Sequence, residues 1–243
     1  MSRLAGKVAV VTGAAGGLGV TLCEVLRREG AEVVAVDLAG EGCLHLDIAT
    51  EAGNKAMVDA ALELHGRLDI LALNAGVQHV APIPDFPEAE WDRLFDVMAK
   101  GPFFAMKHGW QALTERPGGR IVVTASGSSF IAEAYKAAYV AAKHAVLGLV
   151  RVAAIEGGPF GLTANAVAPG WMRTPMVENQ LASQMELHGR SRDEVIATMV
   201  ERQPVKRFVE TEEVANTIAF LASDASAGIN GACVPVDLGL LVS

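Results

Sequence analysis

Short apolar runs alternate with longer amphipathic segments from one end of the chain to the other. Val8–Thr12, a β-branched run without charged residues, is typical of a strand buried on both faces. We expect further strands at Val33–Asp37, Leu44–Asp47, Ile70–Asn74, Ile121–Ser126, Thr163–Ala168 and Cys233–Asp237. We expect helices at Leu18–Glu29, Glu51–His65, Glu88–Leu113 with a kink at Gly101–Pro102, Ala137–Glu156 and Glu212–Ser223.

This βαβα order predicts an α/β fold, a single-domain, Rossmann-type, doubly wound parallel sheet with helices on both faces. No crossover helix fits between Asp37 and Leu44, so we expect a loop there. Residues 171–207 carry an additional, more polar helical pattern. An insertion beyond the carboxyl end of a strand can cover a substrate crevice, which we predict here. We find no repeat or linker and predict one domain over residues 1–243.

Composition narrows the possible partners. The chain is 51% hydrophobic, enough for a large core, and its net charge of −8 argues against nucleic acid and anionic membranes. No uninterrupted apolar stretch approaches the ~20 residues of a membrane span, and Val8–Val11 is too short for a signal peptide. The three cysteines form no Cys-x-x-Cys and the six histidines no metal-binding spacing. We therefore expect a soluble, cytoplasmic protein without a metal.

A glycine-rich segment joins the first strand to the first helix. In Thr12–Gly19, Gly13 permits a tight turn, Gly17 lets the backbone approach a pyrophosphate, and Gly19 allows close helix–strand packing. The helix N-terminus then offers N–H groups to phosphate. An ordinary glycine turn is the alternative, but the strand–turn–helix context favours dinucleotide binding.

Asp37 ends the second predicted strand, where an acidic residue accepts a hydrogen bond from a ribose 2′-hydroxyl. No Arg or Lys stands at Ala14, Ala15 or Leu38 to offset a 2′-phosphate. We therefore predict NAD rather than NADP. A turn or capping role is the alternative for Asp37.

Tyr139 and Lys143 are four residues apart, so they share one face of a helix. An ammonium beside a phenol is expected to lower the pKa of the tyrosine, which suits proton transfer near neutral pH. Ser126 precedes the tyrosine and is placed to donate a hydrogen bond to a substrate oxygen. Alternatively, Tyr139 and Lys143 are a pair on the surface of a helix, and Ser126 is simply the residue that ends a strand.

Together these residues resemble the short-chain dehydrogenase/reductase family over nearly the whole chain. The resemblance implies a Ser126–Tyr139–Lys143 catalytic set, with the phenolate taking the hydroxyl proton while hydride passes to the nicotinamide of NAD. It implies a small-molecule substrate and a homotetramer built from the long helices. The implied cofactor-binding residues are Gly13, Gly17, Leu18, Gly19, Asp37, Asp47, Asn74, Ala75, Gly76, Tyr139, Lys143, Pro169, Gly170 and Thr174.

Several segments are similar to D-3-hydroxybutyrate dehydrogenases, including Asn74–Val80, Tyr139–His144, Asn165–Trp171 and Gln203–Val209. This likeness implies a 3-hydroxy acid such as 3-hydroxybutyrate as substrate. The implied substrate contacts are Gln78, Ser126, Ser128, Lys136, Tyr139, Trp171 and Gln180, of which Gln78, Lys136 and Gln180 would hold the carboxylate. A solvated lysine is the alternative for Lys136, and Tyr135 is a further candidate for the pocket wall.

Two departures from the family pattern leave the function open. Met98 stands where the family usually has an asparagine of a proton relay, and Ser128 stands where hydroxybutyrate dehydrogenases have a histidine. The second change favours, as an alternative, a bulkier or uncharged hydroxy or keto substrate. The first keeps open a different class of protein, an NAD-binding regulator with little turnover.

Overall fold

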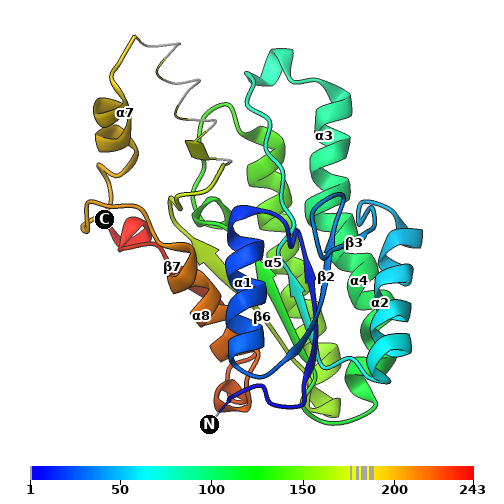
Figure 1. The fold of residues 1–243 in the computed structure, drawn as a ribbon. Helices are drawn as coiled ribbons and strands as arrows, with labels where there is room; N and C mark the ends of the chain where they lie inside the picture. Colours follow the sequence, from blue (N-terminus) through cyan, green and yellow to red (C-terminus); the bar gives the residue numbers. More distant parts are fainter. Residues whose placement is uncertain (1, 176, 179–180, 182–184, 186–188) are drawn as a thin grey trace.

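The strands form one parallel sheet, as the apolar runs predict. The computed structural model describes residues 2–175, 177–178, 181, 185 and 189–243. Within these residues seven strands lie in the order β3-β2-β1-β4-β5-β6-β7 (Figure 1). Their bounds are β1 Val8–Thr12, β2 Glu32–Asp37, β3 Leu44–His45, β4 Ile70–Leu73, β5 Arg120–Thr124, β6 Thr163–Pro169 and β7 Cys233–Val236.

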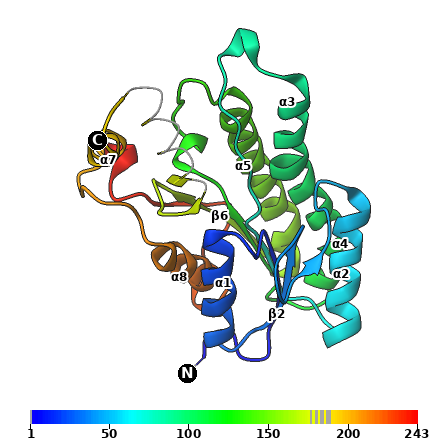
Figure 2. The same ribbon diagram turned by 45° about the horizontal axis from the view of Figure 1, so that its top comes forward.

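Helices cover both faces of this sheet (Figures 1 and 2). The described α-helices are α1 Gly17–Arg28, α2 Glu51–His65, α3 Glu88–Phe95, α4 Gly101–Thr114, α5 Ala137–Gly157, α7 Arg192–Met199 and α8 Thr211–Leu221. Short helical turns lie at η1 Ile83–Asp85, η2 Asp96–Lys100, η3 Gly127–Ser129, η4 Gly158–Phe160, η5 Asp224–Ser226 and η6 Leu240–Val242. The predicted polar helix of the insertion is α7.

The core consists of two layers separated by the sheet. Val8 and Val10 pack in one cluster with α2, α4 and α5, whereas the alternate residues Ala9 and Val11 pack in the other with α1 and α8. Successive side chains of a strand point to opposite faces, so a strand covered on both faces must be apolar throughout. This explains why the strands read as continuous apolar runs.

The long helical region between β4 and β5 is divided directly before Gly101 and Pro102, where the sequence predicts a kink. Residues Asp96–Lys100 form a π-helical turn, and α4 begins directly after it at Gly101. Pro102 has no N–H for the carbonyl four residues earlier, which belongs to Met98, and its ring crowds that carbonyl. The irregular turn therefore precedes the proline rather than centring on it.

Among the described residues, one helix is long and apolar enough to cross a membrane, by length and composition alone. Ala137–Phe160 has a mean hydropathy of 1.5. Its residues Val146, Val150 and Ala153 are buried in the core beneath the sheet. Core packing therefore accounts for much of its apolar character.

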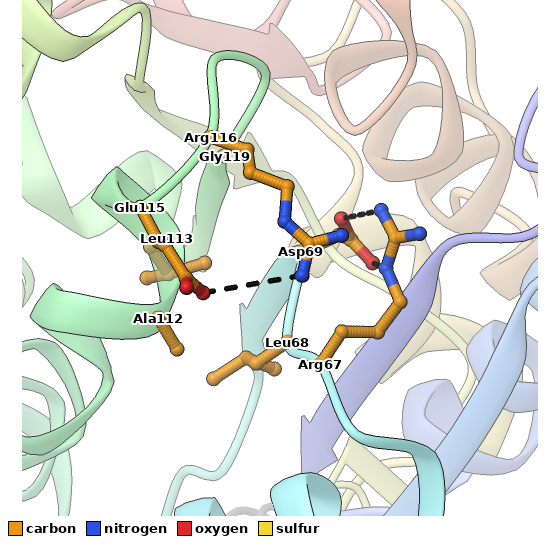
Figure 3. A pocket seen from close by; sticks show the side chains of 8 residues that line it. All are labelled: Arg67, Leu68, Asp69, Ala112, Leu113, Glu115, Arg116 and Gly119. Atoms are coloured by element: carbon orange, nitrogen blue, oxygen red, sulfur yellow. Dashed lines mark hydrogen bonds and ion pairs between the residues drawn. The ribbon is translucent and has the colours of Figure 1, made fainter.

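A small hollow lies at the amino edge of the sheet, before β4 and β5 (Figure 3). Arg67 and Asp69 form a two-pronged ion pair at 2.6 and 2.8 Å, and Asp69 also accepts from the N–H of Val8 at 2.8 Å. These contacts fix the start of the strands, at the edge opposite to the predicted site. The lining residues are Arg67, Leu68, Asp69, Ala112, Leu113, Glu115, Arg116 and Gly119.

Candidate active site

The glycine loop brings the N-terminus of α1 to the carboxyl edge of the sheet. Gly13 has a φ of 66°, and a Cβ there would lie 2.7 Å from the Cα of Ala75. A Cβ on Gly19 would lie 1.9 Å from the carbonyl oxygen of Gly13. The N-cap residue Gly16 has no side chain to cap the helix, and Gly17–Val20 has no carboxylate. The first N–H groups of α1 therefore suit a phosphate, which fits the predicted dinucleotide.

Thr12 and Asn74 tie the ends of β1 and β4 together beside this loop. The Thr12 hydroxyl accepts from the N–H groups of Asn74 and Ala75 at 3.0 and 3.2 Å. The Asn74 amide donates to the Gly13 carbonyl and accepts from the Thr124 hydroxyl, both at 3.2 Å. Strand order reverses between β1 and β4, and ligands of open α/β sheets bind outside such a switch point.

Asp37 lies at the end of β2 and faces the glycine loop, as predicted. Its Oδ2 accepts from the N–H of Ala15 at 2.9 Å, and its Oδ1 accepts from the N–H of Leu38 at 2.7 Å. These bonds hold the carboxylate in place, while the Leu38 side chain is exposed.

Residues following β6 return to the same loop. The N–H of Gly170 donates to the carbonyl of Val236 at 3.0 Å, and a Cβ on Gly170 would lie 3.0 Å from the Cα of Asp237. A Cβ added to Gly17 would lie 3.2 Å from the Cβ of Thr174, so Thr174 lies against the start of α1. The structure thus brings Thr174 to the glycine loop, although the two are far apart in sequence, and packs Gly170 against the end of β7.

The three predicted catalytic residues converge where β5 ends and α5 begins. The Lys143 ammonium donates to the carbonyl of Thr124 at 2.7 Å and lies 5.7 Å from the centre of the Tyr139 ring. Ser126 caps the turn η3, and its hydroxyl accepts from the N–H of Ser128 at 3.1 Å. Tyr139 and Lys143 lie in the first two turns of α5, as their spacing predicts.

The sequence predicts that Lys143 lowers the pKa of Tyr139, but in the folded chain the pKa of Tyr139 is raised. Burial raises the pKa of Tyr139; a hydrogen bond with Ser126 opposes this, and the charge of Glu133 adds to it. Burial also lowers the pKa of Lys143 to about 8. The Lys143 ammonium donates to the Thr124 carbonyl, and burial of the phenol is the largest cause of the raised pKa of Tyr139.

Met98 occupies the space beside the catalytic lysine. It is buried in the π-helical turn and packs with Ala142 and Tyr139. The side chains of Met98 and Lys143 both approach Gly76. A Cβ added to Gly76 would lie 3.8 Å from the Met98 Sδ and 3.9 Å from the Lys143 Nζ. A thioether is a poor hydrogen-bond acceptor, so it leaves the ammonium poorly solvated, which agrees with the lowered pKa of Lys143.

Replacing Met98 by Asn is expected to raise the pKa of Lys143, because an amide oxygen accepts from the ammonium. Alcohol oxidation at pH 9 is then expected to be a few-fold faster than in the parent. The gain is small because the pKa of Lys143 governs only a part of the ~10²–10⁴-fold rate increase that general acid–base catalysis contributes. The pH profile of kcat measures this. Met98→Leu, which keeps the site apolar, is the control, and identical profiles of the two variants would exclude a role for residue 98.

Lys136 points inward but is already paired. Its ammonium donates to the Glu133 carboxylate at 2.8 Å and lies 4.5 Å from the centre of the Trp171 ring. The Ser128 hydroxyl donates to the other oxygen of Glu133 at 2.6 Å. The structure thus brings three predicted substrate residues together around Glu133, which sequence reasoning missed. An acid three residues before Lys136 was the available signal.

The other predicted residues differ in how they are placed. Gln78 is half-buried, and its amide oxygen accepts from the N–H of His79 at 3.1 Å. Asp47 is exposed before α2 and accepts from the N–H of Ala49 at 3.0 Å. The Tyr135 side chain is exposed. Their binding roles stay predictions, and Gln180 lies outside the described residues.

Comparison with known proteins identifies the family. A family model described as Enoyl-(Acyl carrier protein) reductase matches residues 13–241. The chain is 38% identical over 250 residues to an uncharacterised oxidoreductase of Bacillus subtilis, covering 96% of this chain and 97% of that protein. It is 33% identical to a D-beta-hydroxybutyrate dehydrogenase of Rhizobium meliloti, covering 96% and 98%. The ligand-free structure of an aldohexose dehydrogenase from Thermoplasma acidophilum has a TM-score of 0.93 and 30% identity, covering 100% and 96%.

These matches span the glycine loop, the strand ends and the serine, tyrosine and lysine of the site. The predicted catalytic residues also stand in the geometry described above, with Lys143 and Tyr139 on one face of α5. The chain therefore belongs to the short-chain dehydrogenase/reductase family, whose members are oxidoreductases acting on CH–OH groups.

Proposed function

We propose that this chain is an NAD-dependent dehydrogenase that transfers a hydride between nicotinamide and a secondary alcohol or ketone. The observation that carries the proposal is the convergence of Ser126, Tyr139 and Lys143 beside a glycine loop that suits a dinucleotide. When bound, the nicotinamide supplies hydride chemistry, and the protein supplies orientation and proton control.

Each catalytic side chain has a distinct task in alcohol oxidation. Tyr139 as phenolate accepts the proton of the substrate hydroxyl, and Ser126 donates a hydrogen bond to the same oxygen as it becomes carbonyl-like. Lys143, whose ammonium donates to the Thr124 carbonyl, would bind the nicotinamide ribose. Because burial raises the pKa of Tyr139, oxidation is expected to accelerate as pH rises and more phenolate forms.

The preference for NAD rests on Asp37. Its two oxygens accept from the N–H groups of Ala15 and Leu38, so the carboxylate is held at the end of β2 beside the glycine loop. This supports a contact with the adenosine ribose, which an acidic residue at this strand end makes in dinucleotide-binding folds. A 2′-hydroxyl can donate to this carboxylate, whereas a 2′-phosphate would be repelled by it.

We expect the Asp37→Ser, Leu38→Arg double variant to shift the ratio of kcat/KM for NAD over NADP by about 10²-fold toward NADP. The change removes the repelling charge and adds a guanidinium suited to phosphate. Reduced dinucleotide formed with a panel of secondary alcohols is followed by its absorbance. Asp37→Asn, which removes the charge but keeps an acceptor, separates electrostatics from loop geometry. A parent enzyme that uses NADP better than NAD would refute the assignment.

Two substrate classes remain candidates for this site. The 33% identity to D-beta-hydroxybutyrate dehydrogenase supports a 3-hydroxy acid such as 3-hydroxybutyrate. The pairing of Lys136 with Glu133, and the similarity to an aldohexose dehydrogenase, support an uncharged hydroxy or keto substrate. An NAD-binding regulator is the third candidate, motivated by Met98. Tight NAD binding without turnover of any alcohol or ketone would favour the regulator.

A further inference from the structure

We propose that Glu133 determines substrate specificity: it neutralises Lys136 and directs the site toward uncharged substrates rather than carboxylates. This inference rests on the proposed dehydrogenase function and specifies its substrate class. Its basis is one network, in which the two oxygens of Glu133 accept from Lys136 at 2.8 Å and from Ser128 at 2.6 Å.

The chain path builds this network beside the reacting groups. Glu133 lies between the short helical turn η3, which carries Ser128, and the helix α5, which carries Tyr139. Tyr135 has a φ of 67°, rare for a residue with a side chain, and its carbonyl accepts from the N–H of Ala81 at 2.9 Å. This tight loop leads directly into Lys136, the N-cap residue of α5. The loop is thus held so that the following lysine turns toward the protein.

The Lys136 ammonium has little exposure to solvent. Its side chain is 11% exposed, compared with 29% for that of Glu133. The Trp171 ring, 4.5 Å from the ammonium, covers a further side of the cation. A buried ammonium needs a compensating anion, and here the protein itself provides that anion.

Glu133 also influences the catalytic phenol directly. Its carboxylate accepts from the Ser128 hydroxyl at 2.6 Å, and the Ser128 N–H donates to the Ser126 hydroxyl at 3.1 Å, so one residue separates Glu133 from Ser126. The charge of Glu133 also raises the pKa of Tyr139, after the larger effect of burial. A substrate bound at Tyr139 would therefore have Glu133 as a neighbour. A substrate carboxylate near Lys136 would meet a cation that is already neutralised, together with a like charge. A hydroxyl, by contrast, can donate to the exposed side of Glu133.

The test compares 3-hydroxybutyrate, as both enantiomers, with its methyl ester, a substrate pair that differs in charge. In the NAD-loaded parent enzyme we expect a higher kcat/KM for the ester. Glu133→Gln keeps the shape but removes the charge, and is expected to raise the acid-to-ester ratio of kcat/KM about tenfold or more. Glu63→Gln, at an exposed position of α2, makes the same charge change away from the site and is expected to leave the ratio unchanged.

A second measurement needs no turnover. Butyrate, which has the carboxylate but no reacting hydroxyl, is titrated calorimetrically into NAD-loaded protein. Glu133→Gln is expected to bind butyrate about tenfold more tightly than the parent, and adding Lys136→Met is expected to abolish the gain. A Glu133→Gln variant that binds butyrate no better than the parent would overturn the specificity role. Failure of the dehydrogenase proposal has a different signature, the absence of NAD reduction with every alcohol tested.

Discussion

Replacing Tyr139 by Phe is expected to lower kcat for alcohol oxidation by about 10²- to 10⁴-fold, the range of general acid–base catalysis. The phenol oxygen is the only heavy atom removed, and in the proposed mechanism it accepts the substrate proton. The ring packs with Met98, Ala138 and Ala142, so the variant keeps its apolar contacts. Initial rates with NAD and a secondary alcohol measure the loss.

Binding and folding controls make this result specific. NAD affinity, measured by calorimetry, and the melting temperature are expected to stay near those of the parent, because the loop at Gly13–Gly19 is untouched. A Tyr139→Phe enzyme that retained most of its kcat would remove Tyr139 from the proton-transfer step. It would also remove the main reason to treat this crevice as catalytic.

Replacing Gly19 by Ala is expected to weaken NAD binding by about 10²-fold or more, equivalent to about 2.7 kcal/mol. The new Cβ would lie 1.9 Å from the Gly13 carbonyl oxygen and 2.8 Å from the Cα of Ala14. Both contacts are with backbone, so the loop itself must move away from α1. The first-turn N–H groups and the loop then no longer converge on the phosphates.

The same clash is expected to reduce stability. Overpacking a tight interior costs about 1–3 kcal/mol, which lowers the melting temperature of a chain of this size by roughly 2–12 °C. Gly16→Ala is the matched control, since its φ is −76° and its Cβ would meet only the Gly13 oxygen at 3.4 Å. Equal NAD affinity in the two variants would show that Gly19 does not shape the cofactor site.

Much of the fold was predictable because local patterns are strong in a doubly wound sheet. Strands buried on both faces are continuous apolar runs, and β1, β5 and β6 were recognised within one or two residues at each end. Thr50 caps α2 by accepting from the N–H of Gly53 at 3.0 Å, and Gly66 ends the helix with a φ of 68°. These are local signals that the residues themselves carry.

Other features depend on neighbours that no short pattern reveals. The π-helical form of the turn at Asp96–Lys100, directly before the predicted kink at Gly101–Pro102, is one of them. The pKa of Tyr139 is raised because the folded chain buries the phenol. The partner of Lys136 is Glu133, a residue that no familiar motif identifies.

By itself, the sequence determined the α/β fold and supplied the glycine loop and the side chains that we propose for cofactor binding and catalysis. These depend on hydrophobic period, on glycine's lack of a Cβ and on residue spacing along one helix. Only the tertiary structure decided the charges within the site, namely which ammonium is neutralised and which phenol is desolvated. Those properties arise from distances between segments and from burial, and neither exists before the chain has folded.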